Sequence, residues 1–245
     1  MIALEENTLL FKFPEVHADA TLRVDFQRTL RIPDDDRDYP LPPGLGCFPL
    51  QHVDDFASGV PEAWLRHGGV MLPMYQSEAL WLNFESHHDY PFAVKVAAGK
   101  IDAVTGDDWN DGLHRKPQDY LAIPDQPWLD GFCVEKGVIR QFVAMPLGSG
   151  YSAEEQLKGT GEFGGIQVIA YPLKAEHYRP VRYRESFVEA TVCASVAPDM
   201  ALAPGGRMQQ EIYEDHRPLG HWNRERSSRC FVHLANSLVW RAITG

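Results

Sequence analysis

Paired cysteines are missing from this sequence. The four cysteines, Cys47, Cys133, Cys193 and Cys230, lie far apart, and no CxxC pair occurs. The last three have apolar neighbours typical of strands, so buried, reduced thiols are the expected state. Two disulfides remain compatible with the count, but no spacing requires them.

Membrane-spanning and targeting segments are also missing. No apolar run approaches the roughly 20 residues that a membrane-spanning helix needs. Glu5 and Glu6 stand where a signal peptide carries positive charge. Lys and Arg number 23 against 34 Asp and Glu, a formal net charge of −11 that disfavours general binding to nucleic acids or anionic membranes. We therefore expect a soluble, cytoplasmic protein with no nucleic-acid or membrane partner.

Motifs of nucleophilic catalysis and nucleotide binding are not present either. The chain has no GxSxG, no P-loop lysine and no HExxH. Residues 148–153 fit GxGxxA, but the helix that follows would be short, and Glu154 and Glu155 would oppose a phosphate. A glycine-rich excursion between two strands, residues 148–165, is the favoured interpretation, and it could serve as a lid.

Ten histidines raise the question of a metal site. Two groups are candidates: the residues around His87 (Glu85, His87 and Asp89) and those around His216 (Asp215, His216 and His221). Neither group has the spacing of a known zinc or iron motif. The sequence therefore predicts no bound metal and no cofactor, and leaves open whether either histidine region holds an ion.

Strand-like patterns fill most of the chain. Leu22, Val24 and Phe26 alternate with polar residues, which predicts a strand with one apolar face. Further strand-like runs lie at 91–106, 132–145, 164–173 and 181–196, and residues 231–243 are expected to form the last element. Short helices are expected within 52–66 and from Ser152, where Glu155 completes a capping box, and a strand and a short helix fit residues 208–215 equally well. Roughly ten strands against a few short helices predict a mainly β protein, all-β or α+β. We expect one domain over residues 1–245, a mostly antiparallel barrel or packed sheets with long loops.

Residues 33–49 form a proline-rich segment with five prolines. Proline removes a backbone donor, so the segment is expected to be a long loop or arm without regular structure. Its apolar residues, among them Leu41 and Phe48, favour packing across the body or onto a second subunit. A homo-oligomer formed through this arm is therefore one possible assembly.

The run from Val70 to Phe84 is apolar on both faces when it is read as a single extended strand. Such a strand is usually covered on both sides. Gln76 and Glu78 interrupt one face at its centre, and a buried carboxylate has to be paired, hydrogen-bonded or protonated. Glu78 is therefore the candidate catalytic acid or base, since a shifted pKa suits proton transfer.

Polar side chains also occur within other apolar strands. They are Lys95, Arg140, Gln141 and Gln167, and together with Gln76 they are the candidate ligand-binding residues. Some could equally point to solvent or form structural ion pairs.

If these polar residues converge, they provide fixed hydrogen-bonding groups in an apolar wall, which is typical of a small-molecule site. The favoured hypothesis is non-catalytic binding of a small organic ligand. The alternatives are an enzyme in which Glu78 acts while Lys95 or Arg140 faces it and holds an anionic substrate, and an assembly protein that docks through residues 33–49.

Overall fold

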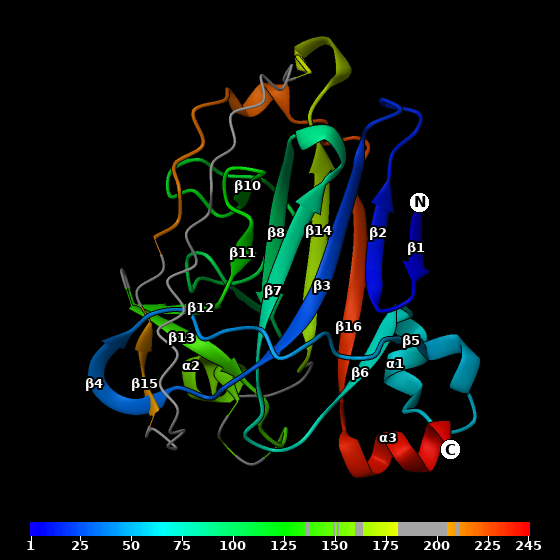
Figure 1. Cartoon of the computed structure of the whole chain (residues 1–245), viewed down its shortest axis with the longest axis vertical. Helices are drawn as coiled ribbons and strands as arrows, with labels where there is room; N and C mark the ends of the chain where they lie inside the picture. Colours follow the sequence, from blue (N-terminus) through cyan, green and yellow to red (C-terminus); the bar gives the residue numbers. More distant parts are fainter. Residues whose placement is uncertain (136–137, 149, 151, 160–163, 181–204, 209–210) are drawn as a thin grey trace, which may run out of the picture.

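Two packed β-sheets form the body of the structure (Figure 1). The computed structural model describes residues 1–135, 138–148, 150, 152–159, 164–180, 205–208 and 211–245. Within these residues it has sixteen strands and three short α-helices. The prediction of a mainly β, mostly antiparallel fold is confirmed, and among the described strands the sheets are open rather than closed into a barrel.

The first sheet follows the order β1-β2-β3-β7-β13-β15-β4, with β11 beside β7 and β12 beside β13. Among the strands described for this sheet, only the β15–β4 pair is parallel. The strands are β1 (Ile2–Glu5), β2 (Thr8–Lys12), β3 (Thr21–Thr29), β4 (Pro33–Tyr39), β7 (Ala79–Ser86), β11 (Trp128–Leu129), β12 (Gly131–Glu135), β13 (Val138–Val143) and β15 (Gly205–Met208).

The second sheet follows the order β10-β8-β14-β16-β6-β5, with β9 beside β8. β16 and β6 run parallel, and the other pairs are antiparallel. The strands are β5 (Gln51–His52), β6 (Val70–Met74), β8 (Phe92–Ala98), β9 (Ile101–Asp102), β10 (Leu121–Ile123), β14 (Ile166–Pro172) and β16 (Ser228–Asn236).

The core lies between the two sheets. The alternation predicted for residues 22–26 is confirmed, because Leu22, Val24 and Phe26 are fully buried in β3 while the residues between them are half-buried. They belong to one apolar cluster with residues of the second sheet such as Val94 and Val168. In Figure 1, β3 and β7 cross in front of β8 and β14, which form the layer behind.

The helices are short and peripheral. α1 (Glu62–His67) and α3 (Ser237–Thr244) lie near the foot of the second sheet in Figure 1, and α2 (Ala153–Lys158) lies below β13. The capping box predicted at Ser152 is confirmed, with both reciprocal hydrogen bonds to Glu155 present. Single turns of 3-10 helix occur at Val53–Phe56, His87–Asp89, Ala175–His177 and Leu219–His221. No helix among the described residues is long and apolar enough to cross a membrane.

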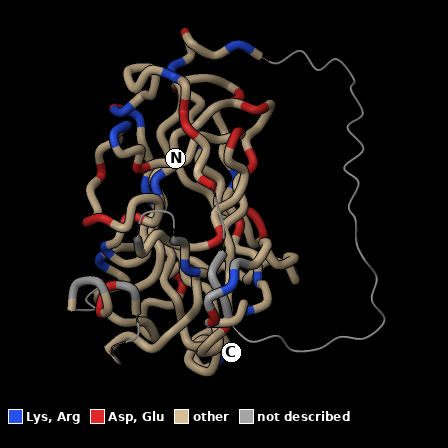
Figure 2. Tube along the Cα trace, turned by 90° about the vertical axis from the view of Figure 1, so that its left-hand side faces the viewer, with Lys and Arg blue, Asp and Glu red and all other residues tan. Residues whose placement is uncertain are grey.

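Charged residues are mixed along the trace, with Lys and Arg interspersed among Asp and Glu (Figure 2). The described cysteines are free thiols: Cys133 and Cys230 are buried and Cys47 is exposed. Burial raises the pKa of Cys230 to about 12, which makes its thiol unreactive. Cys193 and the strand expected at 181–196 lie outside the described residues.

The prediction that residues 33–49 have no regular structure is wrong in its first half. Pro33–Tyr39 forms β4, an edge strand parallel to β15. Proline is tolerated as the first residue of an edge strand, where its missing N–H breaks no ladder bond. The second half folds back onto β3, through hydrogen bonds from Phe48 N–H to Phe26 O and from Arg28 N–H to Gly46 O. Docking of this arm on a second subunit stays a prediction.

Candidate functional site

A cleft of about 560 Å³ lies where strands of the two sheets approach α2. Its walls come from β13 and the segment after it, from the ends of β6 and β16, and from the start of β14. The apolar lining includes Ile32, Met74, Leu80, Phe132, Phe142, Val143, Leu147 and Leu234. The polar lining consists of Arg31, Gln76, Arg140, Gln141, Ser152, Glu154, Gln156, His233 and Asn236.

The cleft exists partly because the chain turns a corner within the run from Val70 to Phe84. The prediction of one continuous strand is wrong: β6 ends at Met74 in the second sheet, and β7 begins at Ala79 in the first. Between them Ser77 takes a left-handed φ of 69°. Ser77 N–H donates to Ala144 O, and Ala144 N–H donates to Glu78 O, so the corner is attached to the segment that follows β13.

Glu78 stabilises this corner and does not line the cleft. Its Oε2 accepts a hydrogen bond of 2.8 Å from Tyr75 N–H, and its Oε1 accepts one of 2.9 Å from Arg28 Nε. The guanidinium of Arg28 in turn lies 4.3 Å from the centre of the Phe48 ring. The partner of Glu78 is therefore Arg28, and the expectation that Lys95 or Arg140 faces it is corrected.

Lys95 lies away from the cleft, on the other face of β8. The side chain is fully buried, with Nζ 2.6 Å from Asp119 Oδ2 and 3.2 Å from Asp102 Oδ2. Nζ also donates to Gly112 O over 2.9 Å. The ammonium thus fastens the 102–119 excursion onto β8, which is a structural role.

The two candidate glutamines that are buried, Gln141 and Gln167, also hold backbone groups. Gln141 Nε2 donates to Leu30 O and its Oε1 accepts from Ile32 N–H, while its side chain borders the cleft. Gln167 lies outside the lining, where its Nε2 donates to Gly99 O over 2.9 Å. Gln76 and Arg140 are exposed residues of the lining. Of the six candidate residues, the cleft therefore brings together Gln76, Arg140 and Gln141.

Sequence patterns did not single out the aromatic wall of the cleft. The ring of Trp64 stacks on His233 at 4.8 Å between centroids, with 19° between the planes. His233 Nε2 lies 3.0 Å from Gly68 O, so this nitrogen carries the proton and Nδ1 is an acceptor. Burial lowers the pKa of His233, so the imidazole is neutral at pH 7. Phe231 and His233 are two residues apart in β16 and their rings lie 6.4 Å apart between centroids, so this spacing was the sequence signal that could have pointed to His233.

Glu154 is a second lining residue that sequence reasoning did not assign to a site. Its side chain is buried, and its Oε1 accepts from Lys100 N–H over 2.8 Å. Its Oε2 accepts from Gly164 N–H over 3.0 Å. The carboxylate therefore joins α2 to the turn after β8 and to the start of β14, which fixes one wall of the cleft.

We expect Gly99→Ala to disrupt this wall. Gly99 has a φ of 60°, and an added Cβ would lie 2.2 Å from the carboxyl carbon of Glu154. The displaced carboxylate would lose its backbone partners, so the free energy of unfolding should fall by about 1–3 kcal/mol in urea denaturation. Gly220→Ala is the control, because nothing lies within 4 Å of its added Cβ. Equal losses in the two variants would contradict this account of the wall.

Residues of the two histidine groups that the sequence left open have other partners in the structure. Glu85 pairs with Arg23, with 3.8 Å between Oε2 and Nε. Asp215 is buried and accepts hydrogen bonds from Tyr120 Oη and Trp222 Nε1. The described part of the chain instead brings His87 and His88 to Asp19.

Comparisons with protein-family models, with curated proteins and with solved structures find no match for this chain, so the geometry of its sites is the basis for any assignment of function.

Proposed function

We propose that this protein binds a small, largely apolar organic molecule with an acidic group in the cleft between its sheets, without catalysing a reaction on it. The observation that carries the proposal is the make-up of the cleft. A volume of about 560 Å³ falls within the usual range for small-molecule sites, and such sites combine an apolar wall with a few placed polar groups.

The lining gives this ligand its expected chemistry. Trp64 and the neutral His233 offer stacked rings on which a flat apolar body can pack. Arg31 and Arg140 bring positive charge to the lining, and both oxygens of Glu154 already accept backbone hydrogen bonds. Guanidinium groups bind carboxylates and similar anions through paired hydrogen bonds, which favours an acidic group on the ligand.

The position of Glu78 is the reason to favour ligand binding over a reaction catalysed by this carboxylate. Glu78 is outside the lining, and its two oxygens accept from Arg28 and Tyr75. A general acid or base has to come within hydrogen-bond reach of its substrate. The corner between β6 and β7 gives Glu78 a structural task instead.

Anilinonaphthalene sulfonate, which joins an apolar body to an anionic group, is the probe that we would use to test the cleft. We expect saturable fluorescence enhancement with one probe per chain. Ala144 lines the cleft and is half-buried, so Ala144→Trp should fill the space and weaken binding by about tenfold, or 1.4 kcal/mol.

The matched control is Ala57→Trp, at an exposed alanine outside the lining. It should bind the probe as the unmodified protein does, with thermal unfolding showing that both variants are folded. Unsaturable binding, or equal affinity in Ala144→Trp and the unmodified protein, would refute the proposal.

A further inference from the structure

A cluster of metal-ligating side chains lies at the end of the first sheet, apart from the cleft. Asp19 belongs to the connection between β2 and β3, and His87 and His88 belong to the turn between β7 and β8. β3 and β7 pair antiparallel, with Leu22 opposite Ser86, so these two connections meet at the same end of the sheet. Residues almost 70 positions apart are thus brought together by strand register.

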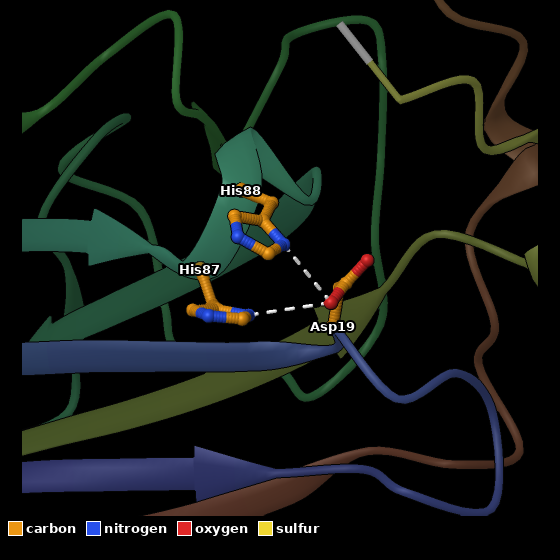
Figure 3. Close-up of side chains that lie close together, drawn as sticks. All are labelled: Asp19, His87 and His88. Carbon is orange, nitrogen blue, oxygen red and sulfur yellow. Dashed lines mark hydrogen bonds and ion pairs between the residues drawn. The ribbon is translucent and has the colours of Figure 1, made fainter.

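Both imidazoles point at the same carboxylate oxygen (Figure 3). The Nδ1 atoms of His87 and His88 lie 3.4 Å and 3.1 Å from Asp19 Oδ1. The three ligand atoms all lie within 4.8 Å of one another. Adjacent ligand atoms around an ion with bonds of about 2.1 Å are separated by roughly 3.0–3.4 Å, so the observed spacing is close to that of a coordination sphere.

Backbone geometry explains how two consecutive histidines serve one site. Side chains of neighbouring residues in an extended segment point to opposite sides. His88 instead has φ 49° and ψ 35°, and Asp89 also has a left-handed φ of 54°. The chain therefore turns at His88, and the two imidazole centroids lie 3.9 Å apart on the same side.

A second layer of contacts holds the ligand-bearing backbone. Asp19 N–H donates to His17 Nδ1 over 3.1 Å, and Tyr178 Oη donates to the carbonyl of His88 over 3.0 Å. His17 packs on Tyr90 and against the edge of Tyr178. Such outer contacts orient the ligands of metal sites.

We propose that Asp19, His87 and His88 bind one divalent first-row transition-metal ion, with Zn²⁺ as the reference ion. Two imidazole nitrogens and one carboxylate oxygen match the ligand preference of this class and leave at least one position for water or another ligand. The side chains of His87 and His88 are 55% and 66% exposed, so an ion can reach the site from solvent.

Isothermal titration of Zn²⁺ into the chelator-treated full chain tests this proposal. We expect one ion per chain in the unmodified protein. His88→Ala and Asp19→Asn should each weaken binding by at least about tenfold, since each removes one of three ligands. Co²⁺ should give a visible absorption band of low-coordinate Co²⁺ that His88→Ala loses.

His52→Ala and His216→Ala are the controls, because both histidines are exposed and neither belongs to the cluster. They should leave the affinity unchanged, and circular dichroism should show that all four variants are folded. An unmodified protein that binds no ion, or one whose affinity is the same in His88→Ala, would overturn the proposal. Loss of binding in His216→Ala would overturn it as well.

Discussion

Lys95→Met is expected to lower the free energy of unfolding by about 3–5 kcal/mol, among the largest effects of any single substitution in this chain. Lys95 is fully buried, and the side chains of Asp102 and Asp119 are only 2% and 6% exposed. Methionine replaces the apolar stem but removes the charge, which leaves two carboxylates facing each other without their cation. Residues 102–119 would at the same time lose the contacts with Lys95 that hold them on β8.

Chemical denaturation of the variant beside Lys12→Met measures this effect. Lys12 pairs with Glu5 over 2.8 Å, but the two side chains are 36% and 53% exposed. Exposed pairs of that kind contribute little to stability, so the control should remain close to the unmodified protein. A loss below about 1 kcal/mol for Lys95→Met would show that the ion pairs of Lys95 contribute little to the stability of the fold.

The pKa of Asp102 is informative about this outcome. Burial raises it, whereas Lys95 and the backbone N–H groups of Val104 and Thr105 lower it, and burial has the larger influence. Removal of Lys95 would raise the pKa of Asp102 further, so the destabilisation by Lys95→Met should be smaller at pH 4 than at pH 8.

Asp130→Asn is expected to stabilise the protein at alkaline pH and to change little at pH 4. The side chain is 2% exposed, and burial raises its pKa from 3.8 to about 7. The folded state therefore binds this proton more tightly than the unfolded chain does. The stability that the protonated carboxyl of Asp130 contributes is fully present below pH 4. This contribution is lost as the pH rises through 7, because the buried carboxyl then has to ionise.

The uncharged amide of Asp130→Asn removes the cost of ionising a buried carboxyl. The free energy of unfolding above pH 8 should therefore rise by on the order of 2–4 kcal/mol. Urea denaturation of both proteins from pH 4 to pH 9 gives the difference profile, in which titrations common to the two proteins cancel. Asp55→Asn is the control, since Asp55 is exposed and its profile should follow that of the unmodified protein. A difference in stability between Asp130→Asn and the unmodified protein that does not change with pH would contradict the raised pKa of Asp130.

Local sequence determined the β-rich class and several elements. The alternation of Leu22, Val24 and Phe26 predicted β3, and Ser152 with Glu155 predicted the start of α2. These signals depend on residues two to four positions apart, so no knowledge of the tertiary structure is needed to interpret them. The prolines of residues 33–49 led to a wrong prediction, because only the presence of β15 makes Pro33–Tyr39 a strand.

Tertiary structure decided which polar side chains meet. The sequence indicated that Glu78 and Lys95 sit among apolar neighbours, but alternation assigns a residue to a face without specifying what covers that face. Arg28 lies 50 positions before Glu78, and Asp119 lies 24 positions after Lys95. The cleft and the Asp19–His87–His88 cluster likewise depend on strand pairing across long separations. Pairing energy comes from contacts that form only when distant segments are already in register, so no local pattern predicts it.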